Sequence, residues 1–241
     1  MPHTLLLRLS GPMQSWGISS RFKIRDTGLE PSKSGVIGLL CASLGKPRNE
    51  SHPANTNKPR LAELIALRMG VRVNREGVIK KDFHTVGGIH GKGKEYGVRK
   101  ANSDKGDTVI SDRFYLSDFD FLVGLEGKEK DEELLRTLNG ALGQPHWQIF
   151  LGRKAFVPAL PVHLPSGEGL RLNTRLEDAL RYNWPLELQE ESLRFVIEED
   201  ANHPLAQVRA DVPRNFVSKA RRFDLRSVVI YFKKFDEEGE Q

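Results

Sequence analysis

The chain of 241 residues has a single cysteine, Cys41, which excludes an internal disulfide and a zinc site built from cysteines. It has no apolar run long enough to cross a bilayer, and its first residues lack the basic, apolar and small-residue order of a secretion signal. The spacing of its histidines matches no zinc site, and the sequence has no cluster of carboxylates of the kind that two-metal nucleases use. These absences predict a cytoplasmic protein that needs no cofactor, binds no metal and contacts no membrane.

Positive charge is in modest excess, since 37 Lys and Arg stand against 32 Asp and Glu and give a formal net charge of +5. The acidic residues concentrate in a few short stretches, which leaves three longer segments basic: 8–33, 72–113 and 209–226. This separation of charge predicts one surface that faces a polyanion. Because 38% of the residues are hydrophobic, the chain can bury the core of one domain with an appendage or of two small domains.

Apolar patterns predict strands and helices in the first part of the chain. The apolar run over residues 4–9 predicts a buried strand. Ser32 is a typical N-cap for a helix that carries apolar residues at helical spacing and ends at Gly45. Further on, residues 119–125 predict an interior strand, and residues 131–142 predict a helix whose first turn is acidic.

A long insertion interrupts this series. From Lys80 to Asp112 the chain shows almost no apolar periodicity, and an insertion of this length is either disordered or functional. The order of the elements around it predicts an α+β fold, with a ferredoxin-like (RRM-like) βαββαβ domain over residues 1–154. The proline-punctuated remainder, residues 155–241, predicts a smaller β-rich C-terminal region.

The loop after the first strand carries Gln14 and Trp16 between two glycines. An exposed indole there would stack on an unpaired base while the amide contacts a base edge, which is how proteins commonly read single-stranded RNA. The alternative is that Trp16 packs beneath the loop as part of the core. The sequence leaves both interpretations open.

The start of the first helix is a second candidate site. Arg21 and Arg25 precede it, and Ser32, Lys33 and Ser34 form its first turn. Free amide groups, hydroxyls and a lysine at a helix N-terminus form a ready phosphate site. The glycines that a nucleotide-binding P-loop places before its lysine are absent. An ordinary capped helix has the same residues, so both interpretations remain.

The insertion itself carries Arg99, Lys100 and Arg113 among its cations. A basic, glycine-rich segment with little apolar content gains order by docking, for which phosphates are the obvious partner, and a solvated loop is the alternative. His84 adds a candidate general base for metal-independent RNA cleavage. Histidines in polar loops are more commonly structural or in contact with RNA.

Four segments of the chain share a resemblance to one known family: Leu7–Gly17, Pro31–Leu40, Asp82–Gly88 and Phe150–Lys154. Together with Asp211–Pro213, they resemble the CasD subunit family of the type I-E CRISPR Cascade complex. The matches run from the first strand to the last, and the combination is much more specific than any one segment.

The resemblance implies an RNA-binding protein of antiviral defense that clasps the 5′ handle of the CRISPR RNA (crRNA). Its β-hairpin thumb, at about residues 83–115, would touch the Cascade backbone subunit. The protein would also dock the large subunit, and would reach target DNA indirectly through the complex. In type I-E systems another subunit cuts the precursor RNA, so the implied role is non-catalytic. In a related subtype the equivalent protein makes the cut, so the alternative is a metal-independent endoribonuclease of repeat RNA with His84 as a catalytic residue.

Motif position and charge together select the predicted RNA-binding residues. They are Gln14, Trp16, Arg21, Arg25, Ser32, Lys33, Ser34, Arg99, Lys100, Arg113, Arg153 and Lys154.

Overall fold

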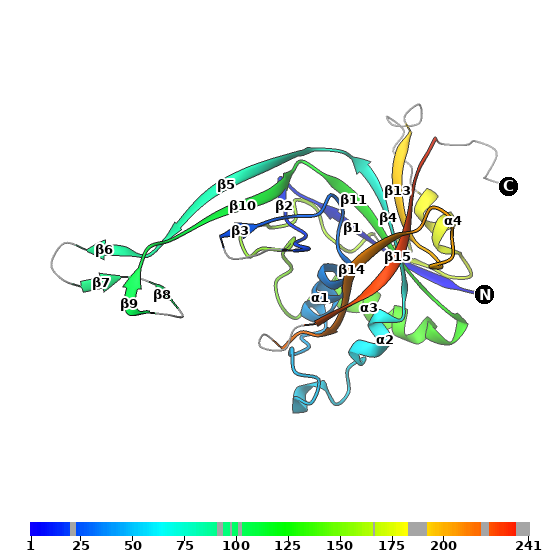
Figure 1. Cartoon of the computed structure of the whole chain (residues 1–241). Coiled ribbons are helices and arrows are strands. Elements are labelled where there is room, and N and C mark those ends of the chain that lie inside the picture. The colour runs from blue at the N-terminus through cyan, green and yellow to red at the C-terminus, as the bar shows by residue number, and fades with distance from the viewer. Residues whose placement is uncertain are drawn as a thin grey trace.

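The computed structural model describes most of the chain, and side chains are described outside residues 88–107. The described residues are 1–19, 23–90, 94–96, 98–100, 103–165, 167–182, 192–217 and 222–234. They form an α+β fold around one large antiparallel sheet (Figure 1). No helix among these residues is long and apolar enough to span a bilayer.

The large sheet has seven strands in the order β12-β1-β11-β4-β13-β15-β14. The interior strand β1 (His3–Ser10) pairs with β11 along its whole length, from His3 opposite Gly127 to Ser10 opposite Asp120. The other strands are β4 (Arg68–Arg75), β11 (Asp120–Gly127), β12 (Leu170–Arg171), β13 (Leu193–Glu198), β14 (Gln207–Asn215) and β15 (Arg222–Lys233). The predicted strands at residues 4–9 and 119–125 are therefore confirmed as β1 and β11.

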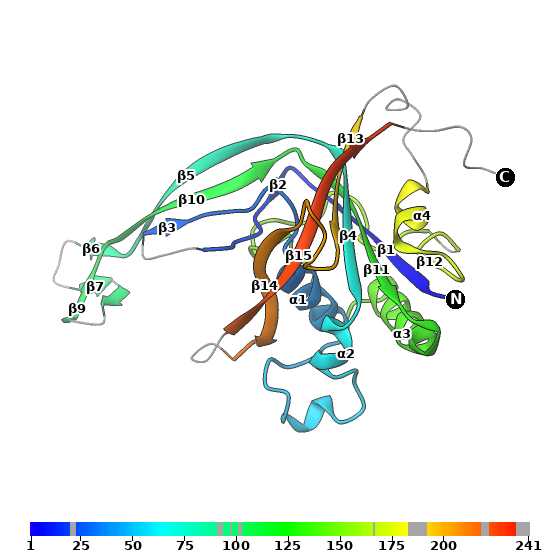
Figure 2. The same cartoon turned by 45° about the vertical axis from the view of Figure 1, so that its right-hand side comes forward.

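Helices cover both faces of this sheet (Figures 1 and 2). Those over the first face are α1 (Lys33–Ser43), which begins at the predicted N-cap Ser32, and α3 (Glu132–Gly143). The helix α4 (Leu176–Arg181) covers the second face. The remaining short helices are α2 (Leu61–Ile65) and the 3-10 turns η1 (Pro53–Asn55) and η2 (Glu129–Asp131).

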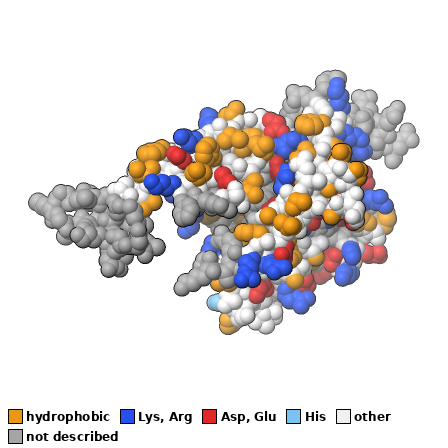
Figure 3. Space-filling view, in the orientation of Figure 1, with side chains coloured by type: hydrophobic (Ala, Val, Ile, Leu, Met, Phe, Trp, Pro, Cys, Tyr) orange, Lys and Arg blue, Asp and Glu red, His pale blue; other side chains and the backbone are white. Residues whose placement is uncertain are grey.

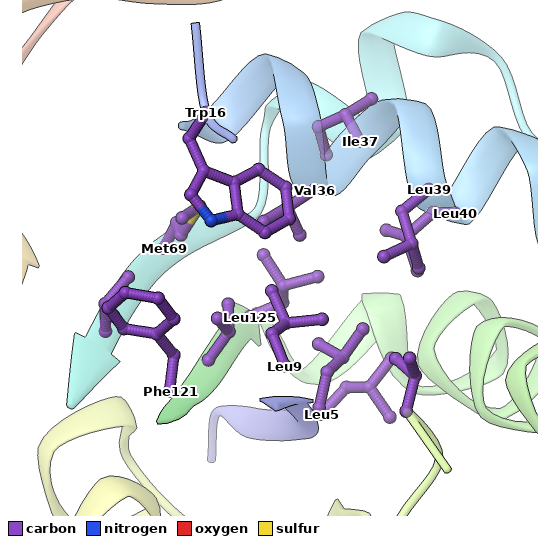
Figure 4. Packing of buried hydrophobic residues seen from close by; sticks show 14 of the residues in the cluster. Leu5, Leu9, Trp16, Val36, Ile37, Leu39, Leu40, Met69, Phe121 and Leu125 are labelled. Carbon is purple, nitrogen blue, oxygen red and sulfur yellow. The ribbon is translucent and has the colours of Figure 1, made fainter. Parts of the chain in front are cut away.

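The alternation of β1 divides the core in two. Leu5, Leu7 and Leu9 point to the α1 and α3 face, whereas Leu6 points to the α4 face. Figure 4 shows the larger cluster, in which Trp16 packs beneath the first turns of α1. All four leucines are at most 1% exposed, so their burial is a main source of stability.

An arm projects from this body in both ribbon views (Figures 1 and 2). It consists of β5 (Val78–Val86) and β10 (Val109–Ser117), which pair from Val78 opposite Ser117 to Val86 opposite Val109. Two short strands flank β10 at its base, β2 (Met13–Gln14) and β3 (Ile24–Arg25). Farther out lie β6 (Gly88–His90) paired with β7 (Lys94–Tyr96), and β8 (Val98–Lys100) paired with β9 (Ser103–Asp107). The insertion therefore contains paired strands despite its lack of an apolar pattern.

The C-terminal strands continue the large sheet. β13 pairs with β4 on one side and with β15 on the other, so the sheet passes without a break from the first half of the chain to the second. The predicted division after residue 154 therefore does not coincide with a gap in the sheet.

Candidate functional site

A groove of about 610 Å³ runs along the outward side of α1. Its floor includes Gly38 and Ala42 of the helix, and its rim carries the exposed cations Arg48 and Lys154. Aromatic side chains complete the walls: Trp147, Phe150, Phe216 and Phe223. Cations beside aromatic rings are the residues with which proteins bind single-stranded nucleic acid.

One end of the groove is fixed by a close approach of two loops. The Ser15 amide donates to the Leu151 carbonyl over 3.0 Å. At Gly152 the backbone has φ +94°, and a Cβ atom there would lie 1.8 Å from the Ser15 carbonyl oxygen, so only glycine fits. This contact places Arg153, the next residue, between the groove and the base of the arm.

Three arginines gather at the base of the arm. Arg25 and Arg113 lie opposite each other on β3 and β10, and Arg153 reaches them from its loop. Its guanidinium donates to the carbonyls of Phe114, over 2.7 Å, and Arg25, over 3.3 Å. Among the described residues, none of the three guanidinium groups has a carboxylate within 4.0 Å. We call Arg25, Arg113 and Arg153 the arginine cluster.

The cluster is electrostatically unfavourable in the absence of an anion. Burial and the positive charges of Arg113 and Arg25 lower the pKa of Arg153, and Asp82 only partly opposes this shift. Like charges held together in partly buried surroundings weaken the fold unless a negative group lies among them. The site therefore has the properties of a receptor for an anion such as a phosphate.

The N-terminus of α1 is not a free phosphate site, and the prediction for Lys33 needs correction. The carboxylate of Asp211 accepts the Lys33 backbone amide over 2.8 Å, in the place that a phosphate would take. The Lys33 ammonium lies 2.9 Å from Glu198 with its side chain 3% exposed, and burial lowers its pKa while Glu198 opposes the shift. Arg226 closes the network with two bonds to Asp211, over 2.7 and 3.0 Å.

Gln14 and Trp16 are also structural. The Gln14 amide is fully buried and donates to the carbonyls of Leu9 and Phe119. The Trp16 ring is 2% exposed, and its indole N–H donates to the Gln14 side chain. Of the two interpretations that the sequence left open for Trp16, core packing is the one realised, because the loop folds back over the ring.

The other predicted residues divide into three groups. Ser32 is a buried N-cap that accepts the Gly35 amide, although it lines the groove together with Ser34 and Lys154. Arg21 lies outside the described residues. For Arg99 and Lys100 only the backbone of β8 is described, so their side chains stay predictions.

His84 lies on the arm, where its Nε2 is 3.1 Å from a carboxylate oxygen of Asp82. Both side chains are about half exposed and point to the same face of the arm as Arg113, which stands opposite Asp82. Among the residues that the structure describes, no group of three or more His, Cys, Asp or Glu side chains could hold a metal ion.

Trp147, Phe216 and Phe223 are groove residues that the sequence prediction omitted. A signal existed for Trp147, since a large aromatic residue in the polar loop after α3 has no place in a helical or strand pattern. Phe216 and Phe223 lie far from α1 in sequence and reach the groove only because β14 and β15 pair next to each other.

Comparisons with known proteins identify the class to which the chain belongs. The profile of the family "CRISPR-associated protein (Cas_Cas5)" matches residues 4–229. The chain therefore belongs to the Cas5 family of CRISPR-associated proteins.

Individual relatives agree with this assignment. The CRISPR system Cascade subunit CasD of Escherichia coli strain K12 is 30% identical over 168 residues, which cover 66% of this chain and 69% of CasD. A chain of a solved CRISPR RNA-guided surveillance complex is 34% identical, with a TM-score of 0.71 over 98% of this chain and 92% of that one. A crystal structure of a Cas protein, also 34% identical, has a TM-score of 0.64 and covers 98% and 96% of the two chains.

Proposed function

We propose that the chain is a non-catalytic, RNA-binding subunit of a type I-E Cascade complex that holds the 5′ handle of the crRNA. The observation that carries this proposal is the arginine cluster, because three neighbouring guanidinium groups, none with a carboxylate within 4.0 Å among the described residues, favour binding of an anion. Phosphates of the handle would supply it, and the adjoining groove would take the unpaired nucleotides. Similarity to the CasD subunit and to a chain of an RNA-guided surveillance complex supports this role.

The arm would act as the thumb of this subunit. Its face opposite the arginine cluster exposes Ile24, Ile79, Phe83 and Ile110, each between 41% and 61%, around an ion pair of Lys81 and Asp112. Figure 3 shows hydrophobic side chains along the arm. A hairpin with an arginine cluster on one face and exposed large hydrophobic side chains on the other suits contact with RNA on one side and with the Cascade backbone subunit on the other. The remaining surface would dock the large subunit, through which the complex reaches target DNA.

The strand order supports the ferredoxin-like reading of the first domain. Strands β12, β1, β11 and β4 are neighbours and antiparallel, α1 lies between β1 and β4 in the chain, and α3 lies between β11 and β12. This order supports a split βαβ unit, into which the arm would be inserted between β4 and β11.

The proposed RNA binding is tested by its dependence on salt. The full chain should bind repeat RNA with an affinity that falls steeply as KCl rises, because each neutralised phosphate releases counterions. Changing Arg113 or Arg25 to Ala should lower the slope of log K against log salt by about one unit each. Arg136→Ala is the matched control, since this exposed arginine pairs with Glu132 on α3 and should leave the slope unchanged. A flat salt response of the wild-type chain would contradict the proposal.

The enzymatic alternative is tested separately. The half-exposed pair of Asp82 and His84 could supply a base for cleavage at the 2′-hydroxyl, but we propose that it only contacts RNA. The isolated chain should therefore leave repeat RNA intact in the presence of a chelator. Specific cleavage that His84→Ala abolishes would show that the chain is a metal-independent endoribonuclease.

A further inference from the structure

Trp147 is an exposed indole on a rigid support. Its side chain is 45% exposed, yet its amide donates to the Ala42 carbonyl over 3.2 Å, and the neighbouring His146 amide donates to Ser43 over 2.9 Å. The His146 ring packs edge-on against the indole with ring centroids 5.5 Å apart. The loop is thus tied to the end of α1, and the large apolar ring stays at the groove without reaching the core.

Gly38, one turn before Ala42 on α1, has no packing reason to be glycine. A Cβ atom at Gly38 would meet only the Phe216 ring, at 4.0 Å, whereas one at Gly35 would lie 2.8 Å from the Trp16 ring. The fold therefore requires glycine at 35 but not at 38, and glycine in a helix interior costs about 1 kcal/mol relative to alanine. The groove floor is left bare at a cost to the helix.

We propose that the part of the groove between Trp147 and Phe216, above Gly38, is a subsite for one unstacked nucleobase. A bare floor admits the flat face of a base, and Trp147 offers a fixed ring on which it stacks. The exposed cations Lys154 and Arg48 on the rim are placed to neutralise the flanking phosphates. This inference rests on the proposed function, and it adds that a base, rather than the backbone alone, is bound here.

The stacking contact is tested with two probes, the single-stranded repeat RNA and an oligoribonucleotide of equal length that lacks all bases. Trp147→Ala should weaken binding of the repeat RNA by about 5- to 150-fold and leave its salt slope unchanged, because stacking is not an ionic contact. Trp147→Phe should retain most of the affinity. Binding of the base-free strand should be the same for all three chains. An equal loss for both probes, or no loss for either, would overturn the subsite.

The floor is tested by filling it. Gly38→Leu should keep or raise the melting midpoint, because leucine favours the helix. It should weaken binding of repeat RNA by about tenfold or more, because the leucine side chain would occupy the space of the base. Gly140→Leu on the exposed side of α3, where a Cβ meets nothing within 4 Å, is the matched control and should bind as wild type. Normal binding by a folded Gly38→Leu chain would overturn the subsite while leaving the proposed function intact. Failure of the wild-type chain to bind repeat RNA would overturn both.

Discussion

The N-terminus of α1 and the base of the arm use the same kinds of residue in opposite ways. At α1, Lys33 and Arg226 each face a carboxylate, and Asp211 also accepts a backbone amide of the helix. At the base of the arm, Arg25 and Arg113 lie opposite each other, and among the described residues no carboxylate lies within 4.0 Å of either guanidinium group. The first arrangement has its opposite charges within the chain, whereas the second is the one to which we assign a ligand under the proposed function.

This difference teaches that a basic residue near a promising motif indicates a binding site only if its charge has no partner in the fold. Lys33 looked like a phosphate ligand because it begins a helix after several cations. Its partner Glu198 is 165 residues away in the sequence. Arg113 is the reverse case, since its only polar contact among the described side chains is with the Ser111 hydroxyl over 3.1 Å.

The largest effect on stability is expected from removing a carboxylate of the ion-pair network at the N-terminus of α1. Asp211→Ala should lower the free energy of unfolding by about 3–5 kcal/mol, because Arg226 is left buried without its bidentate partner and the Lys33 amide loses its acceptor. The measurement is urea unfolding followed by circular dichroism. Asp224→Ala, which removes the exposed partner of Arg214, is the control and should unfold as wild type. Equal stability of the Asp211 variant would show that the network is not the intramolecular counterpart of a phosphate site.

The second prediction concerns α1, which begins in the network and lines the groove. Burial raises the pKa of the Cys41 thiol to about 11 from an ordinary 9.0. Because the shift is upward, the unreactive protonated thiol persists above pH 9, and alkylation at pH 8 should be about 100-fold slower than that of an ordinary cysteine. The rate with iodoacetamide should rise about tenfold for each pH unit up to about pH 11. A fast reaction at pH 8 would contradict the burial of this groove wall.

Arg153 has both a structural role and a place in the arginine cluster, so its variants test the two roles separately. It donates to two backbone carbonyls and also adds charge to the arginine cluster. Arg153→Ala and Arg153→Lys should both lower the free energy of unfolding by about 1–2 kcal/mol, since lysine cannot span both carbonyls. Only the alanine variant should also reduce the salt slope of RNA binding. If lysine restores full stability, the bridging contact is unimportant.

The smallest effect on stability is expected from shortening the arm. Replacing residues 90–109 with a short turn should shift the melting midpoint by only a few degrees, because surface changes away from the core usually cost about 0.5 kcal/mol or less. The shortened chain should nevertheless copurify poorly with guide RNA and partner subunits. Normal yield and normal target binding of the complex from a well-folded shortened chain would show that the arm has no docking role.

Local elements of this protein were predictable from the sequence. The apolar run of β1, the N-cap Ser32 and the acidic first turn of α3 each depend on residues a few positions apart, and all three elements are found where the pattern places them. The motifs also predicted the family, which the match to the Cas5 profile confirms.

Only the tertiary structure decided which polar and aromatic residues face outward. Gln14 and Trp16 are buried because a loop folds over them, and Lys33 is neutralised by a strand from the other end of the chain. Trp147 lines the groove because its loop is hydrogen-bonded to the end of α1. These outcomes depend on contacts between segments far apart in sequence, whose desolvation and pairing energies no local pattern contains.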